Sequence, residues 1–213
     1  MIGAILSEIG KKAAECFKEI KPSKEITAKE ADGFWKTEFA KEAQTAKEGA
    51  KSKEYFDSNG VKYREGDRLL PDKTYEVNGY KYETDSQGRI SSAEGNLRMR
   101  DADYDREMEP GVRNFEGQEY KDSDQRGHLI GHQFGGSDKL ENLVHMDAKL
   151  NQGDFAKLEN TLADAVKDGA DVGIRVEPVY EGDSVRPSDF KVSYSIDGER
   201  EVTVFRNESE VAA

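Results

Sequence analysis

The residues best suited to chemistry near neutral pH are concentrated in one segment, residues 124–160. All three histidines of the chain, His128, His132 and His145, lie in it, together with asparagines beside hydrophobic residues. Histidine is the side chain whose ordinary pKa lies closest to neutrality, so it can take a proton from water there. Most of the remaining chain is rich in Lys, Glu, Asp and Ala. This segment is therefore the candidate site.

His128 is the strongest candidate for a general base. It stands in DQRGHLIGHQFGG, where several glycines oppose a helix and favour a short strand that runs into a loop. Side chains two residues apart share a face of a strand, which places His128 beside Arg126 and turns Leu129 toward the core. An imidazole that accepts a proton, next to a guanidinium that binds phosphate, is what hydrolysis of a phosphodiester requires.

A zinc site is the alternative use of these histidines. His128 and His132 are four residues apart, but the glycines oppose a helix and no Glu stands in the metalloprotease position between them. A zinc centre formed by His128, His132 and His145 stays open as a hypothesis. Taken separately, His132 and His145 are expected to be packing or surface residues.

The surrounding sequence predicts an α+β fold. Residues 74–85 alternate around Asn78-Gly79, which is typical of a tight hairpin, and Ser86–Gly88 predicts a second turn. Residues 154–168 have apolar side chains at helical spacing, followed by Gly169 as the glycine that ends the helix. Residues 172–180 and 190–205 predict strands, the latter with a turn at Asp197-Gly198. Hairpins interspersed with helices, without regular strand-helix-strand alternation, indicate an α+β class.

The length and composition set the domain organisation. A chain of 213 residues holds one ordinary domain and an appendage. We expect residues 1–55 to form a helical stem or docking segment, which a secretion chaperone could bind at residues 1–50, and residues 56–213 to form the main domain. Residues 100–123 are acidic and irregular, which predicts a loop or a short helix.

Several classes of protein are disfavoured by the composition. No apolar run reaches the roughly 20 residues that span a bilayer, and the N-terminal residues make a poor signal peptide. The single Cys16 excludes an internal disulfide and a cysteine metal cage. A net charge of −12 argues against passive coating of nucleic acid, while it suits a basic protein partner.

The motif QRGHLIG…FGG…ENLV…LNQGDFAKLEN resembles the DNA/RNA non-specific endonucleases of the ββα-metal (His-Me finger) class, in the branch of bacterial secreted nuclease toxins. The resemblance covers roughly residues 75–207 and includes YKYETDSQGRISSAEGNL before the motif. It implies a ββα-metal nuclease core and a non-specific endonuclease domain over residues 56–213. The implied activity is metal-dependent hydrolysis of DNA, with RNA as a second substrate.

The resemblance also implies the roles of five residues. His128 is the general base that activates water, Arg126 contacts phosphate, and Asn142 lies on the second short strand and helps hold the site. Asn151, at the start of the helix, is the protein ligand of Mg²⁺, and Glu159 anchors the water shell of that ion. Residues eight apart on a regular helix are separated by about 12 Å, so Glu159 is expected to act through water unless the helix begins late.

Two residues depart from the family pattern. Gln125 stands where the family has Asp directly before the Arg, and His145 stands where many relatives have Pro. Gln125 is the only support for a second hypothesis, a catalytically inactive nuclease-like interaction module. The resemblance further implies a cognate immunity protein as partner, no membrane, and secretion without a Sec-type signal peptide or delivery into a target cell.

Overall fold

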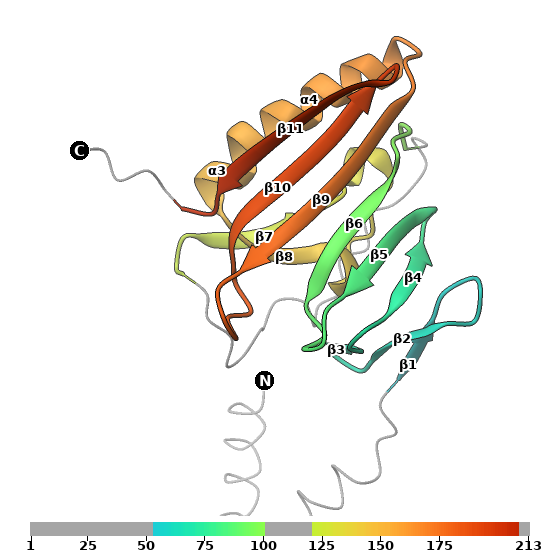
Figure 1. Cartoon of the computed structure of the whole chain (residues 1–213), viewed down its shortest axis with the longest axis vertical. Coiled ribbons are helices and arrows are strands. Elements are labelled where there is room, and N and C mark those ends of the chain that lie inside the picture. Colours follow the sequence, from blue (N-terminus) through green and yellow to red (C-terminus); the bar gives the residue numbers. More distant parts are fainter. Residues whose placement is uncertain (1–52, 101–120, 209–213) are drawn as a thin grey trace, which may run out of the picture. The chain divides into compact units, whose positions relative to one another are not determined.

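The computed structural model describes residues 53–100 and 121–208 (Figure 1). These residues belong to the second of two compact units, Ser52–Ala213. All but the last three residues of the helical stem expected at 1–55, and nearly all of the irregular segment expected at 100–123, lie outside the described residues.

A six-stranded antiparallel sheet is the largest element, and it confirms the predicted hairpins. Its order is β11-β10-β9-β6-β5-β4. Asn78 and Gly79 both have positive φ, 54° and 77°, as do Asp197 and Gly198, 50° and 88°, so both turns use residues that tolerate this backbone. The strands are β4 (Thr74–Val77), β5 (Tyr80–Thr84), β6 (Ile90–Asn96), β9 (Val172–Tyr180), β10 (Pro187–Ile196) and β11 (Glu199–Arg206).

The predicted long helix is α4 (Asp154–Lys167), which lies along strands β9 to β11 (Figure 1). Phe155 packs against Phe190 of β10 and Phe205 of β11, with ring centroids 6.0 and 5.7 Å away. Gly169 follows the helix with φ of 90°, as predicted for its terminating glycine. The shorter α3 (Ala148–Gln152) precedes α4, and the two helices meet at Gly153.

The candidate segment forms a separate hairpin, again as predicted. Strand β7 (Asp124–His128) pairs antiparallel with β8 (Leu143–Asp147), and α3 follows β8 directly. Figure 1 shows this hairpin crossing the lower part of the large sheet. A third sheet contains β1 (Glu54–Phe56), β2 (Lys62–Glu65) and β3 (Arg68–Leu69). Since β1 begins at Glu54, this sheet includes the last two residues of the segment assigned to the stem.

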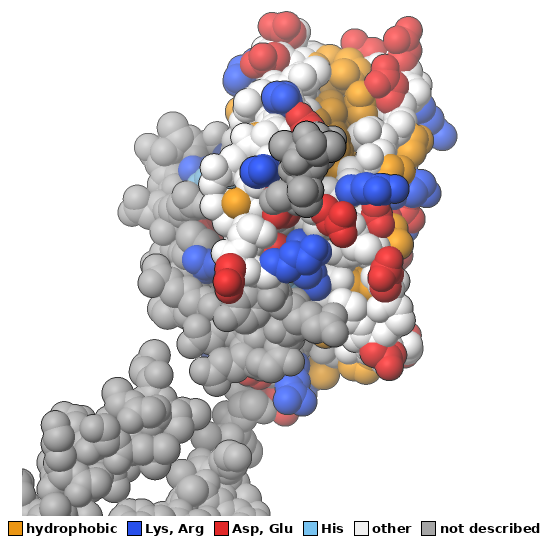
Figure 2. Space-filling model, turned by 90° about the vertical axis from the view of Figure 1, so that its left-hand side faces the viewer, with side chains coloured by type: hydrophobic (Ala, Val, Ile, Leu, Met, Phe, Trp, Pro, Cys, Tyr) orange, Lys and Arg blue, Asp and Glu red, His pale blue; other side chains and the backbone are white. Residues whose placement is uncertain are grey.

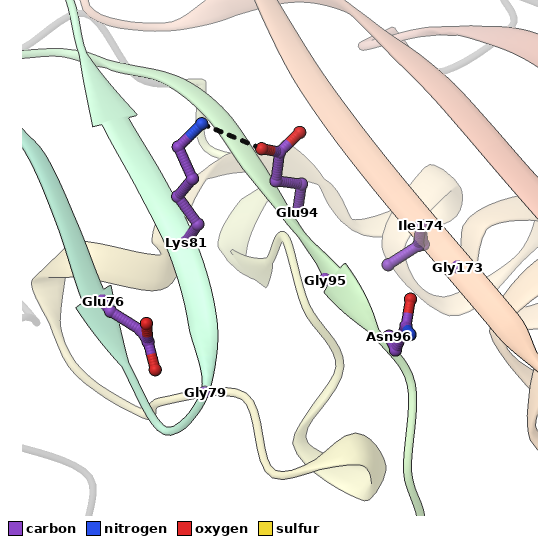
Figure 3. Close-up of a pocket in the computed structure, with 8 residues that line it drawn as sticks. All are labelled: Glu76, Gly79, Lys81, Glu94, Gly95, Asn96, Gly173 and Ile174. Atoms are coloured by element: carbon purple, nitrogen blue, oxygen red, sulfur yellow. Dashed lines mark hydrogen bonds and ion pairs between the residues drawn. The ribbon is translucent and has the colours of Figure 1, made fainter.

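One face of the large sheet is covered with charged side chains. Lys81 lies 2.9 Å from Glu83 and 3.0 Å from Glu94, and Lys191 lies 3.0 Å from Glu177. A pocket on this face is lined by residues of β4, β5, β6 and β9 and of the β4–β5 turn, and the paired Lys81 and Glu94 are among them (Figure 3). Figure 2 shows basic and acidic side chains interspersed on the described part of the face that it presents. No helix in the described part of the chain is long and apolar enough to cross a bilayer.

A buried ion pair ties the hairpin to the large sheet. The Asp124 carboxylate accepts hydrogen bonds from Arg186 Nε at 2.7 Å and Nη2 at 2.8 Å, and the two side chains are 2% and 9% exposed. Burial alone would raise the pKa of Asp124, but hydrogen bonds from Arg186 and the Lys121 N–H lower it below its ordinary value. Asp124 therefore holds the first residue of β7 in place as a carboxylate.

Asp124→Asn is expected to lower the free energy of unfolding by about 3 kcal/mol, because breaking a buried pair leaves a charge without its counter-ion. Urea unfolding at pH 7 measures the change. Asp122→Asn, at an exposed neighbouring position, is the matched control and should stay within about 0.5 kcal/mol of the parent. Equal effects of the two substitutions would contradict a stabilising role for this pair.

Candidate active site

His128 ends strand β7 and contacts a carboxylate. Its Nε2 lies 2.7 Å from Oδ1 of Asp138, and the two side chains are 13% and 5% exposed. Burial alone would raise the pKa of Asp138, but its contacts with His128 and His132 lower it below the ordinary value. Asp138 is therefore an ionised acceptor, and it favours the tautomer of His128 that carries its proton on Nε2. Nδ1 is then the ring nitrogen that bears the lone pair and can accept a proton.

His132 lies in the same cluster, on the short 3₁₀ turn His132–Phe134. Its Nδ1 is 3.0 Å from Oδ1 of Asp138 and 3.3 Å from Nη1 of Arg100. The rings of His128 and His132 are 6.2 Å apart and nearly perpendicular. The candidate ligand atoms of His128, His132 and Asp138 all lie within 4.8 Å of one another, so these three residues could hold a metal ion.

Asn142 holds the loop that carries this cluster. The side chain is fully buried, its Oδ1 accepts from the Ile130 N–H, and its Nδ2 donates to the carbonyls of Ile130 and Ser137. One amide thus fixes both ends of the segment between His128 and Asp138. The sequence placed Asn142 on the second strand, whereas it is the last residue of a 3₁₀ turn directly before β8.

The same loop is anchored to the large sheet. Tyr80 donates a hydrogen bond to the Phe134 carbonyl at 2.6 Å, and the Asn78 amide donates to the Gly135 carbonyl at 3.0 Å. Gly136 fits because a Cβ there would lie 1.8 Å from the Ile130 carbonyl oxygen. Close backbone approach therefore requires glycine at position 136, and the β4–β5 hairpin determines where the loop lies.

Asn151 contacts Gln125, the residue that departs from the family pattern. Its Nδ2 donates to Gln125 Oε1 at 3.0 Å, which fixes the orientation of the amide and leaves Oδ1 as the atom that can bind a cation. Asn151 lies within α3 rather than at the start of the long helix. Gly153, at φ −104° and ψ −105°, separates the two helices. The 12 Å separation expected of one regular helix therefore does not apply to Asn151 and Glu159.

Glu159 brings a second oxygen donor toward the loop. A Cβ built on Gly131 would lie 2.5 Å from Glu159 Oε1, so this carboxylate packs against the backbone three residues after His128. Burial raises the pKa of Glu159 to about 7. A bound cation would stabilise the ionised form of this carboxylate, which burial disfavours in the metal-free protein.

The raised pKa predicts a pH-dependent cost in the metal-free protein. The folded state holds the proton of Glu159 more tightly than the unfolded chain, so its contribution to stability is present below pH 4.5 and is lost as pH rises through about 7. The free energy of unfolding of Glu159→Gln, relative to that of the parent, should therefore rise by about 2 kcal/mol between pH 5 and pH 8 in EDTA. Urea unfolding measures this, with exposed Glu181→Gln as the control. A pH-independent difference would contradict it.

The two remaining predicted residues lie opposite each other on the hairpin. Arg126 is half-buried and pairs in register with His145 of β8. His145 is 7% exposed, and burial lowers its pKa. Among the described residues, the cluster of candidate metal ligands consists of His128, His132 and Asp138 and does not include His145. The three-histidine zinc hypothesis is therefore wrong in its third ligand, and the expected packing role of His145 agrees with its burial.

Asp138 is the candidate functional residue that the sequence did not indicate. It lies ten residues after His128, and no helical or strand period joins the two positions. The loop closed by Asn142 brings them together. The signal available in the sequence was GGSD, a turn followed by an acid directly after the histidine loop.

Comparison with known proteins identifies the family of the chain. The model of the DNA/RNA non-specific endonuclease family matches residues 71–198. The type VII secretion system proteins EssD of Staphylococcus aureus strains USA300 and Newman are 35% identical over 131 residues, which is 58% of this chain and 21% of each relative. The chain thus spans about a fifth of the length of these relatives.

A solved structure shares the fold. The structure of Sda1 nuclease with a bound zinc ion superposes with a TM-score of 0.50 at 19% identity, over 62% of this chain and 76% of the other. At that identity the likeness concerns the fold alone. Together with the family match over residues 71–198, the hairpin β7–β8 followed by α3 shows that the chain belongs to the DNA/RNA non-specific endonuclease family, with a ββα-metal core.

Proposed function

We propose that this domain is a Mg²⁺-dependent, sequence-non-specific endonuclease that hydrolyses phosphodiester bonds of DNA and, as a second substrate, RNA. The observation that carries the proposal is the His128 imidazole at the end of β7, whose Nε2 is held 2.7 Å from a buried carboxylate. This contact favours the proton on Nε2, so that the opposite ring nitrogen bears the lone pair that a general base needs.

The other residues bind and orient the substrate. Arg126 shares the face of β7 with His128, where its guanidinium can contact a phosphate oxygen. A hydrated divalent ion supplies positive charge to the phosphate and to the leaving oxygen when bound. Contacts of this kind carry no base information, which is the reason to expect little sequence preference.

The donor atoms of Asn151 and Glu159 fit Mg²⁺. Both offer oxygen, the ligand this small hard cation prefers, and Mg²⁺ commonly retains several waters beside one or two protein ligands. The amide of Asn151 is oriented by Gln125, and the raised pKa of the half-buried Glu159 comes from burial of its carboxylate. Two positioned oxygens and a site that favours a cation support the assignment.

The relatives support a proposal for the biological setting. EssD is a type VII secretion system protein, and we propose that this chain is likewise a delivered nuclease toxin, exported without a Sec-type signal peptide. A nuclease made in the producing cell endangers its own nucleic acid, so a cognate immunity protein is proposed as partner. Residues 1–50 are proposed to bind a secretion chaperone.

Digestion of plasmid DNA and of RNA, side by side in Mg²⁺ and in EDTA, tests the function. We expect degradation of DNA in Mg²⁺, slower degradation of RNA, and none in EDTA. Failure of the parent protein to cut either substrate over a range of Mg²⁺ concentrations would overturn the proposal.

Asn151→Ala tests the Mg²⁺ ligand separately. Loss of one protein oxygen should raise the Mg²⁺ concentration at half-maximal rate by about tenfold or more. The exposed Asn160→Ala on α4 is the matched control and should leave this concentration unchanged. An Asn151→Ala variant with the Mg²⁺ dependence of the parent would remove Asn151 from the site.

A further inference from the structure

We propose that His128, His132 and Asp138 form a second metal site, for a directly bound Zn²⁺ ion, and that zinc at this site silences the nuclease. Metal binding stands on the geometry of the three side chains. The silencing rests on the proposed function, because it requires His128 to be the base.

The three ligand atoms already converge. Oδ1 of Asp138 is 2.7 Å from His128 Nε2 and 3.0 Å from His132 Nδ1, and all three atoms lie within 4.8 Å of one another. Ligands of a tetrahedral zinc ion at about 2.0–2.2 Å are separated by about 3.3 Å. Side-chain movements on the order of 1 Å therefore convert the cluster into three ligands, and the fourth position remains for water.

The chemistry of this set differs from that of the Mg²⁺ ligands. Two imidazole nitrogens and one carboxylate suit zinc, whereas Mg²⁺ selects oxygen and water. Asn151 and Glu159 provide oxygen only. The domain thus has two sets of possible metal ligands, one suited to zinc and one suited to Mg²⁺. His128 belongs to the set suited to zinc.

Zinc at His128 would invert the tautomer that catalysis requires. In the metal-free state Asp138 favours the proton on Nε2, so that Nδ1 bears the lone pair of the ring. Coordination through Nε2 transfers that proton, through solvent, to Nδ1, so the ring stays neutral and no proton is lost from it. Nδ1 then carries a hydrogen and cannot act as the base.

Arg100 opposes zinc and gives the proposal a distinctive signature. Its Nη1 lies 3.3 Å from His132 Nδ1, so a guanidinium must withdraw before a cation binds there. Arg100→Met, which keeps an unbranched side chain without the charge, should therefore bind zinc several-fold more tightly than the parent. A purely structural role of this arginine would not produce tighter metal binding.

The binding test uses the full chain stripped with EDTA and titrated with Zn²⁺ by calorimetry, and with Co²⁺ followed by its visible absorption. We expect one ion per chain and a Co²⁺ spectrum of low-coordinate type. His132→Ala and Asp138→Ala should each weaken binding by about tenfold or more. His145→Gln, which changes the one histidine outside the cluster, should bind as the parent does.

The activity test compares each variant with itself, with and without one equivalent of Zn²⁺ at saturating Mg²⁺. The parent should lose most of its activity in zinc and regain it on addition of EDTA followed by Mg²⁺. His132→Ala should keep the same activity in the presence and absence of zinc.

The outcomes separate the two proposals. Zinc binding that is lost in His132→Ala supports the site even if the chain cuts no nucleic acid. Zinc binding that persists in His132→Ala but is lost in Asn151→Ala would place the ion at the Mg²⁺ ligands and overturn the inference. Absence of stoichiometric binding, or inhibition that persists in His132→Ala, would also overturn it.

Discussion

His128→Ala is expected to lower the rate of Mg²⁺-dependent DNA hydrolysis by about a thousandfold, the middle of the range that a positioned general base contributes. The side chain is mostly buried at the end of β7, and its Nε2 contact with Asp138 leaves Nδ1 as the proton acceptor. Removing the ring removes the acceptor, while the strand and its pairing with β8 remain. Initial rates on plasmid DNA at saturating Mg²⁺ measure the loss.

The control must separate chemistry from folding. His145→Gln changes the histidine two strand positions away on the paired strand, and its rate should stay within about threefold of the parent, since His145 is a packing residue in this assignment. Both variants should show the circular dichroism spectrum of the parent. A His128→Ala variant that retains a tenth of the parental rate would contradict the assignment of the base.

The sequence predicted well the elements whose signals are local. The turns at Asn78-Gly79 and Asp197-Gly198 require positive φ, and these residue pairs tolerate it, so both hairpins could be predicted from a few residues. The helix α4 has a repeating apolar face and a terminating glycine, which also are local signals. His128 at the end of a strand followed from the glycines around it.

The features that the sequence did not reveal depend on contacts between distant residues. Asp138 approaches His128 only because Asn142 closes the intervening loop and Tyr80 holds it against the large sheet. The break between α3 and α4 depends on Gly153, where a Cβ would lie 2.3 Å from the Lys149 carbonyl oxygen. A glycine in a helical pattern does not by itself distinguish a tolerated residue from a sharp bend.

The role of Gln125 illustrates the same limit. Its departure from the family pattern is the only support for an inactive interaction module. In the structure its side chain orients the Asn151 amide, and the neighbouring Asp124 supplies a buried carboxylate. The family match over residues 71–198 favours the nuclease rather than the inactive module. Gln125 and Asp124 contact residues that lie 26 and 62 positions away in the chain, and the sequence alone does not reveal such contacts.

Asn142→Ala is expected to lower the free energy of unfolding by about 4 kcal/mol and to reduce the activity of the molecules that remain folded. The amide makes three hydrogen bonds to buried backbone groups of Ile130 and Ser137. Alanine leaves those groups without their partner, at a cost of about 1–3 kcal/mol for each, and partial relaxation of the loop offsets some of the sum. The effect should exceed that of Asp124→Asn, where one ion pair is weakened.

Activity per folded molecule distinguishes a positioning role from a merely stabilising one. At a temperature where Asn142→Ala is fully folded, the loop between Ile130 and Ser137 no longer fixes Asp138 against His128, so kcat should fall about tenfold or more with little change in KM. Asp124→Asn, which lies outside this loop, should lose stability and keep its kcat under the same conditions. If Asn142→Ala also kept its kcat, the loop would hold Asp138 against His128 without this amide. The contacts of Tyr80 and Asn78 would then be what positions Asp138.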